Sequence, residues 1–229
     1  MSVFTFKEYI FSQYQWLDQI TSKPGFLPNQ SYLIAKRCLD LLVVLAVLPL
    51  ATVVFTLCAI LIKLEDPHGP VLFIQQRTGK GGRRFGMYKF RTMVANAEEL
   101  KATLAHLNEL QWPDFKITHD PRVTKMGHFL RKTSLDELPQ LINVLKGEMT
   151  LVGPRPTSFS SQTYALWQTE RLDVIPGLTG LWQIMGRGSM EFEDRVYLDV
   201  LYIEHRSLWL DIQILARTVL AVLSQRGAH

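Results

Sequence analysis

Two adjacent carboxylates, Asp136 and Glu137, give this chain its clearest chemical signal. They lie in the segment 133–156, which reads TSLDELPQLINVLKGEMTLVGPRP. An ionised aspartate can attack phosphorus and form an acyl phosphate, and a neighbouring glutamate can help to hold a divalent cation such as Mg²⁺. A helix is expected over residues 138–146, with Pro139 at a favoured first position. Both carboxylates would then stand just ahead of its first turn, where the positive helix end favours anionic groups.

The same motif also has a purely structural interpretation. Ser134 followed three positions later by Glu137 matches a capping box ahead of an apolar run. The carboxylates would then be solvated charges at a helix start, without a catalytic role. Pro139 fits a helix that begins at its own position better than one capped by Ser134. The motif alone leaves both interpretations open.

Basic residues surround the pair in the sequence. A stretch without any acid carries Arg77, Lys80, Arg83, Arg84, Lys89 and Arg91, and the approach to the pair carries Arg122, Lys125, Arg131 and Lys132. Arg155 follows between two prolines, which restrict the backbone and so limit where its guanidinium points. Such a surface can be a solvated face that attracts anionic lipid, at about 1 kcal/mol per residue. It can equally bind a diphosphate, which needs several donors converging on one place.

Length and composition fit one domain with a sizeable core, or one domain plus an appendage. The chain has 229 residues, of which 47% are hydrophobic and 20% charged, so it is not a disordered chain. A net charge of +4 and a pI near 9.1 suit partners that carry phosphate, without choosing between nucleic acid, nucleotide and lipid. Cys38 and Cys58 are too few for a disulfide framework and suggest small buried side chains. The histidines show no metal-ligand spacing, and the turn at residues 79–84 matches no phosphate-loop motif.

A run of 22 residues without charge, residues 41–62, is long enough to enter a bilayer. As a helix it would extend roughly 33 Å, about the thickness of the hydrocarbon core. Pro49 lies near its middle and predicts a bend. Lys36 and Arg37 precede the run and Lys63 follows it, which indicates that both ends face the cytoplasm. A helix that dips into one leaflet and returns fits these facts, and a single spanning helix is the alternative.

The remaining segments predict a mixed architecture. The expected elements are a β-hairpin at residues 71–76 and 84–90, a helical segment at 94–111, a charged loop at 112–132, and two helices within 192–223 that divide near Ser207. Asp211 and Thr218, seven positions apart, mark a polar stripe on the last helix. Residues 1–20 have no secretory signal and are rich in aromatic side chains, which suits either an interfacial helix or a helix packed on the core.

Several long motifs occur in one order: KRCLDLLVV before Pro49, then GPVLFIQQRTGKGG, KFRTM, SLDELPQLINVLKGEMTLVGPRP and PGLTGLWQIMGR, followed by DRVYLDVLYIEHRSLWLDIQIL. In these motifs the chain resembles bacterial sugar transferases of the monotopic phosphoglycosyl transferase class. The resemblance implies an α+β, mainly helical fold with a re-entrant membrane helix bent at Pro49, a small β-hairpin, and amphipathic interfacial helices around a compact cytoplasmic catalytic domain. It divides the chain into an N-terminal interfacial segment (1–30), the re-entrant helix (31–64) and the catalytic domain (65–229).

The resemblance also implies a reaction. Such enzymes transfer a hexose-1-phosphate from a UDP-sugar to undecaprenyl phosphate and release UMP, as the first membrane step in assembling exopolysaccharide, O-antigen or capsule-type glycans. Asp136 would form a covalent phosphosugar intermediate, and Glu137 would assist, with Mg²⁺ held by both carboxylates. The residues implied in substrate binding are Lys89, Arg91, Arg131, Arg155, Gln183 and Arg187. The motif GLWQ resembles that of transferases for UDP-glucose or UDP-galactose. Ile184 and Met185 depart from the polar residues expected after it, so the identity of the sugar stays open.

The implied location is the bacterial inner membrane, with the catalytic domain on its cytoplasmic face. The expected partners are membrane lipids, the UDP-hexose donor and undecaprenyl phosphate; no nucleic acid is expected, and a homodimer is one alternative for the oligomeric state. The competing hypothesis is a membrane-anchored scaffold whose basic face binds anionic lipid or nucleic acid. It predicts binding that weakens steeply with salt and does not depend on Asp136.

Overall fold

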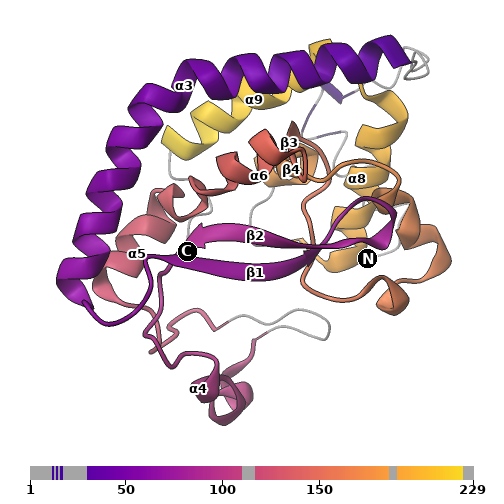
Figure 1. The fold of residues 1–229 in the computed structure, drawn as a ribbon. Coiled ribbons are helices and arrows are strands. Elements are labelled where there is room, and N and C mark those ends of the chain that lie inside the picture. Colours follow the sequence, from indigo (N-terminus) through magenta and orange to yellow (C-terminus); the bar gives the residue numbers. More distant parts are fainter. Residues whose placement is uncertain are drawn as a thin grey trace.

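One long helix, α3 (Gln30–Glu65), borders the molecule on two sides (Figure 1). It crosses the top of the view and then descends along the left, so its two halves run in different directions. This computed structural model describes residues 12, 14, 16, 17, 30–109, 117–185 and 190–223. Arg187 lies outside the described residues, as does nearly all of the interfacial segment expected at residues 1–20.

Most apolar side chains of α3 point away from the protein. Its buried residues are Asp40, Val44, Cys58 and Ile62. By contrast, Leu50 and Leu64 are 71% and 74% exposed. Within the described chain, α3 is the one helix that is long and apolar enough to cross a membrane. Such a surface is typical of contact with lipid. Cys38 is exposed on this helix, and the expectation that it is buried is wrong, because only a narrow side of α3 contacts protein.

The expected hairpin is present. β1 (Leu72–Thr78) pairs with β2 (Arg84–Phe90) in antiparallel register, from Leu72 opposite Phe90 to Thr78 opposite Arg84. Gly81 and Gly82 in the connecting turn have φ of 62° and 77°, a conformation that favours glycine. The hairpin crosses the middle of the molecule, so that the end of β2 reaches the interior near the second half of α3 (Figure 1).

The other described helices are α4 (Glu99–Thr103), α5 (Lys125–Lys132), α6 (Gln140–Lys146), α7 (Leu181–Met185), α8 (Phe192–His205) and α9 (Leu208–Leu223). Short 3₁₀ segments occur at Lys80–Gly82, Ala105–Leu107, Leu135–Glu137, Ser161–Thr163 and Leu166–Leu172. The chain is therefore mainly helical, as expected. α8 and α9 confirm two terminal helices that divide near Ser207.

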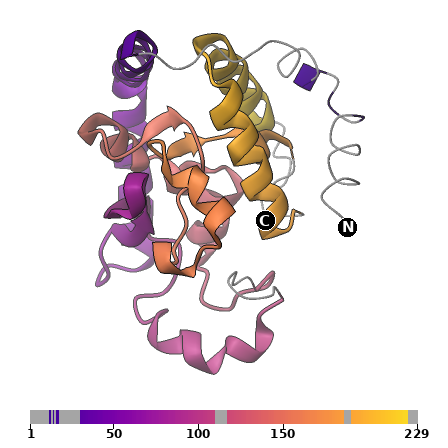
Figure 2. The same cartoon turned by 90° about the vertical axis from the view of Figure 1, so that its right-hand side faces the viewer.

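Two expectations about the middle of the chain are wrong. In residues 94–109, the described part of the helical segment expected at 94–111, the helical structure is limited to the short α4 and one 3₁₀ turn. This part projects from the body of the molecule (Figure 2), and an unpacked helix gains little stability. The charged loop expected at 112–132 ends in α5. Glu65, from the end of α3, caps α5 by accepting hydrogen bonds from the backbone N–H groups of Lys125 and Met126.

Two apolar cores hold these elements together. The larger core joins the first half of α3 to α6, α8 and α9, and its fully buried side chains include Val44, Val144, Leu198 and Ile214. In it, β3 (Thr150–Val152) runs parallel to β4 (Gly177–Thr179), an unexpected pair because each strand is too short to show a pattern. The smaller core joins the second half of α3 to β2 and α5 through Cys58, Ile62, Phe90 and Leu130.

Buried polar groups fix the first half of α3 to the larger core. Asp40 accepts a hydrogen bond from the backbone N–H of Leu151 at 3.1 Å. Asp211 of α9 is 1% exposed and accepts hydrogen bonds from Lys36 of α3 (2.8 Å) and from the hydroxyl of Tyr202 (2.6 Å). The polar stripe expected on the last helix therefore faces the protein.

Candidate active site

The carboxylate pair lies in a tight turn between α5 and α6. Ser134 adopts a left-handed conformation (φ 58°), and a 3₁₀ turn at Leu135–Glu137 follows it. The side chain of Ser134 does not cap a helix, so the capping-box interpretation is wrong. α6 begins at Gln140, with Pro139 as its N-cap. Both carboxylates therefore stand just ahead of this helix, as the proline predicts.

The neighbours of the pair hold it in place. Leu135 and Leu138 pack against the smaller core, which fixes the backbone on both sides of the two acids. The side chains of Asp136 and Glu137 are only 13% and 21% exposed. From the end of β2, Lys89 places its ammonium 3.2 Å from Glu137 Oε1 and 3.7 Å from Asp136 Oδ2. One cation therefore bridges both acids.

Arg155 completes the contacts of Glu137. It follows β3 in the Gly153-Pro154-Arg155-Pro156 corner, and its Nη1 donates to Glu137 Oε2 at 3.2 Å while Nη2 donates to Oε1. Its own backbone carbonyl accepts a hydrogen bond from Arg171 at 2.8 Å. Bidentate pairing of this kind fixes the orientation of a carboxylate as well as its charge. Both carboxylate oxygens of Glu137 are thus occupied by Arg155 and Lys89.

The two acids differ in their electrostatic state. Burial by itself raises the pKa of Glu137, but Arg155 and Lys89 outweigh it and hold the pKa of that carboxyl well below its usual range. Burial raises the pKa of Asp136, and the charge of Glu137 adds to this effect, while Lys89 opposes it only in part. Within the described residues, the Asp136 carboxylate has one ion pair, at 3.7 Å, and accepts no hydrogen bond. It is therefore the less engaged of the two carboxylates.

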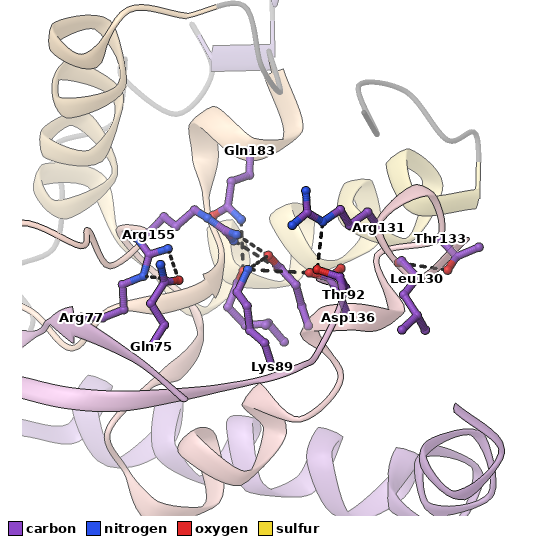
Figure 3. A network of polar contacts seen from close by, with 12 residues as sticks. Gln75, Arg77, Lys89, Thr92, Leu130, Arg131, Thr133, Asp136, Arg155 and Gln183 are labelled. Carbon is purple, nitrogen blue, oxygen red and sulfur yellow. Dashed lines mark hydrogen bonds and ion pairs between the residues drawn. The ribbon is translucent and has the colours of Figure 1, made fainter. Parts of the chain in front are cut away.

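Arg131 and Gln183 lie on either side of these groups (Figure 3). Arg131 of α5 donates from Nε to the Thr92 hydroxyl at 3.0 Å, next to Asp136. Gln183 of α7 is 5% exposed and points toward Arg155 from above in this view. The structure therefore brings six of the expected site residues together, namely Asp136, Glu137, Lys89, Arg131, Arg155 and Gln183.

Comparison with known proteins assigns the chain. A family model described as bacterial sugar transferase matches residues 31–225, which is most of the chain. The chain belongs to this family. The chain is 45% identical over 200 residues to galactosyl transferase CpsE of Streptococcus agalactiae, with 86% of this chain and 44% of the relative covered.

Two further relatives carry more specific names. The undecaprenyl-phosphate galactose phosphotransferase of Salmonella typhimurium is 47% identical over 172 residues, with 73% of this chain and 36% of that protein covered. The UDP-glucose:undecaprenyl-phosphate glucose-1-phosphate transferase of Caulobacter vibrioides is 38% identical, with coverage of 92% and 78%. The transferase spans less than half the length of the relatives from Streptococcus and Salmonella.

Arg91 is not part of the acidic cluster of this sugar transferase. Its guanidinium pairs with the Asp66 carboxylate at 2.5 Å and with the Asp66 carbonyl at 2.9 Å, just beyond the end of α3. A side chain at Gly69 would collide with it. Arg91 thus ties the end of α3 to the strand that carries Lys89, and its contacts give no support to the expected substrate-binding role.

The carboxylate pair of the transferase also passes a limited test as a metal site. No group of three or more His, Cys, Asp or Glu side chains that could hold a metal occurs within the described ranges. Mg²⁺ often uses only one or two carboxylates and takes its other ligands from substrate phosphates and water. Asp136 and Glu137 fit that mode, although a cation would share the oxygens of Glu137 with Arg155 and Lys89.

Sequence reasoning missed a second group of residues in the transferase. A cavity of about 90 Å³ lies on the other side of Arg155, and its lining includes Arg77, Arg171, Arg195 and Trp182. Arg77 belongs to the basic run near the hairpin, and its charge is the one signal that could have pointed here. The others come from distant segments that only the fold brings together.

Proposed function

We propose that this sugar transferase moves a hexose-1-phosphate from a UDP-sugar to undecaprenyl phosphate and releases UMP, through a phosphosugar ester of Asp136. The observation that carries the proposal is the unequal pairing of two adjacent acids. Glu137 is held by two cations, whereas Asp136, whose side chain is 13% exposed, has a single ion pair at 3.7 Å among the described residues. The names of the relatives from Salmonella and Caulobacter support the donor and the acceptor.

The first displacement uses the Asp136 carboxylate as nucleophile. One of its oxygens attacks the phosphorus that carries the sugar, and a new O–P bond forms. The bond from that phosphorus to the bridging oxygen breaks, and its electron pair leaves on UMP. Lys89 and Arg131 lie where they can neutralise the phosphoryl oxygens, and positively charged groups placed there stabilise the transition state.

The second displacement regenerates the enzyme. A phosphate oxygen of undecaprenyl phosphate attacks the same phosphorus, and the bond to Asp136 breaks. The electron pair returns to the carboxylate, and the sugar leaves on a lipid diphosphate. No proton has to be removed from the acceptor, because its phosphate is already ionised. Mg²⁺, held by Asp136 and Glu137, would supply positive charge to the diphosphate.

The membrane arrangement follows from how α3 is anchored. Its beginning binds α9 through Lys36 and α6 through Arg37, whose guanidinium donates to the Val144 carbonyl. Its end binds α5 through Glu65 and β2 through Asp66. Both ends thus contact the same catalytic unit and would lie on one side of a bilayer. This supports a re-entrant helix bent at Pro49, with the catalytic unit on the cytoplasmic face of the inner membrane.

Labelling of single cysteines tests this topology. In a variant without Cys38 and Cys58, one cysteine would be introduced before α3 at Asn29 and another, separately, after it at His68. A membrane-impermeant maleimide should label neither site in spheroplasts with intact membranes and both in inverted membrane vesicles. Labelling of the two sites from opposite sides would establish a spanning helix instead.

The Asp136→Asn variant tests the reaction. It is nearly isosteric, and it should abolish UMP release from the UDP-sugar in the purified, folded protein. Asp173→Asn is the matched control, because the same change falls on an exposed carboxylate and should leave turnover unaltered. Unchanged turnover in Asp136→Asn would exclude Asp136 as nucleophile. Lipid binding without any UMP release from the wild type would instead favour the basic scaffold.

A further inference from the structure

The cavity beside Arg155 lies next to the carboxylate pair and is lined by basic and aromatic side chains. Its volume is about 90 Å³. Arg155 lines it and at the same time donates to Glu137, so one side chain belongs to both places. In Figure 3 Arg155 lies between Arg77 and Asp136. A molecule that reaches from the cavity to Asp136 would therefore pass Arg155.

The charges around this cavity are not balanced. Arg155 pairs with Glu137, and Arg171 pairs with Asp199 at 2.5 Å. Arg77 also lines the cavity, but within the described part of the chain its guanidinium donates only to neutral oxygens, those of the Gln75 side chain (2.6 and 3.1 Å) and of the Pro156 carbonyl (3.3 Å). Burial, together with the nearby charge of Arg155, lowers the pKa of Arg77 to about 10.

A cation without a carboxylate partner, placed beside a second cation, is stabilised when an anion binds between them. The position of Arg77 is therefore that of a phosphate ligand rather than of a structural ion pair. The N–H groups of Arg77 would donate to charged phosphate oxygens, whereas neutral carbonyl oxygens satisfy these donors only in part.

Aromatic rings line the far wall of the cavity. The guanidinium of Arg195 lies 5.5 Å from the centre of the Trp182 ring and 5.6 Å from that of Phe192. Arg171 lies 5.7 Å from the Phe192 ring. Alternating rings and guanidinium planes are the surfaces on which nucleobases stack.

Trp182 adds a polar feature to this wall. Its indole N–H is buried and has no hydrogen-bond acceptor among the residues that the structure describes, although a buried donor of this kind normally has one. A carbonyl oxygen of a bound base would supply the acceptor. The small volume suits one ring better than the fused rings of a purine.

We infer that this cavity holds the uridine monophosphate half of the donor, with the pyrimidine against Trp182 and Phe192 and its phosphate between Arg77 and Arg155. The inference rests on the proposed function and deepens it. The leaving UMP would then lie on the side of the reacting phosphorus opposite to Asp136, as an in-line displacement requires. Trp182 and Arg77 would select the nucleotide and would take no part in the covalent step.

Equilibrium binding of UMP to the full-length protein in nanodiscs tests the inference. Binding is measured in the Asp136→Asn background, so that it does not depend on turnover. Arg77→Gln should weaken UMP binding at least tenfold. Arg83→Gln removes the same charge from an exposed position six residues away and should change binding less than twofold. Trp182→Phe should weaken UMP binding while leaving the binding of inorganic phosphate unchanged, and GMP should bind much more weakly than UMP.

Photocrosslinking gives a test that needs no variant. Irradiation of the wild-type protein with 4-thiouridine monophosphate should label the peptides that carry Trp182 or Phe192. Labelling confined to other segments, or UMP binding that is insensitive to both Arg77→Gln and Trp182→Phe, would overturn the inference. If UMP release persists in that case, the proposed reaction stands and only the placement of the nucleotide is wrong.

Discussion

The cluster around Asp211, which anchors α3, and the candidate active site both place acids beside basic side chains, and they differ in how completely the acids are paired. In the anchoring cluster, Asp211 accepts hydrogen bonds from Lys36 at 2.8 Å and from Tyr202 at 2.6 Å, so both carboxylate oxygens are used. In the candidate active site, Glu137 is paired in the same full way, but Asp136 has one cation at 3.7 Å. Complete pairing makes an anchor between helices, and incomplete pairing leaves a carboxylate that can react.

The largest effect is expected in the anchoring cluster. Asp211→Asn should lower the free energy of unfolding by about 3 kcal/mol, because it leaves the buried ammonium of Lys36 without its counter-ion. Chemical denaturation of the detergent-solubilised protein measures this. The exposed Asp173→Asn is the control and should stay within about 0.5 kcal/mol of the wild type. If both variants are equally stable, the cluster is not an anchor.

The next effect concerns the clamp on Glu137. Glu137→Gln should reduce UMP release on the order of 100-fold, because Arg155 and Lys89 lose the carboxylate that positions them beside Asp136. The amide keeps the shape of the side chain, so the fold should be retained. A purified variant that melts like the wild type and turns over at the wild-type rate would show that the clamp has no role in positioning.

A smaller, pH-dependent effect separates the two acids. The pKa of Asp136 is raised above its ordinary value of 3.8, so ionising it in the folded protein costs stability as pH rises through the raised pKa. Asp136→Asn should therefore raise the melting temperature at pH 7, and the gain should vanish as pH falls below 3.8. The pKa of Glu137 is lowered, so its ionised carboxylate stabilises the fold at pH values above its ordinary pKa of 4.5. Glu137→Gln should therefore lower the melting temperature at pH 7. A gain in Asp136→Asn that persists at pH 3 would contradict this assignment.

Local signals predicted much of this architecture. The glycines of the hairpin turn, the proline that begins α6 and the glycine that ends it each act within a few residues, and the structure follows them. The beginning of α5 has a local cap in Thr124, whose hydroxyl accepts a hydrogen bond from the Gly127 N–H, but its second cap, the Glu65 carboxylate, is 60 positions away and could not be predicted. The parallel pairing of Thr150 with Gly177 is equally non-local.

The candidate site shows the same division between features that the sequence predicts and features that depend on distant segments. The motif and the family resemblance indicated Asp136, Glu137, Lys89 and Arg155, and these four do meet. They could not show that Arg91 pairs with Asp66, because residue type does not reveal which carboxylate a guanidinium meets. The cavity wall of Arg171, Arg195 and Trp182 joins segments that have no shared pattern in the sequence.

The central claim is that Asp136 is esterified during turnover. The direct measurement is mass spectrometry of the protein after rapid quenching with UDP-sugar in the absence of the lipid acceptor. We expect one peptide, containing Asp136, to gain the mass of a hexose phosphate, and the gain to disappear when undecaprenyl phosphate is added. UMP release without any such adduct, or an adduct on a different residue, would contradict the account.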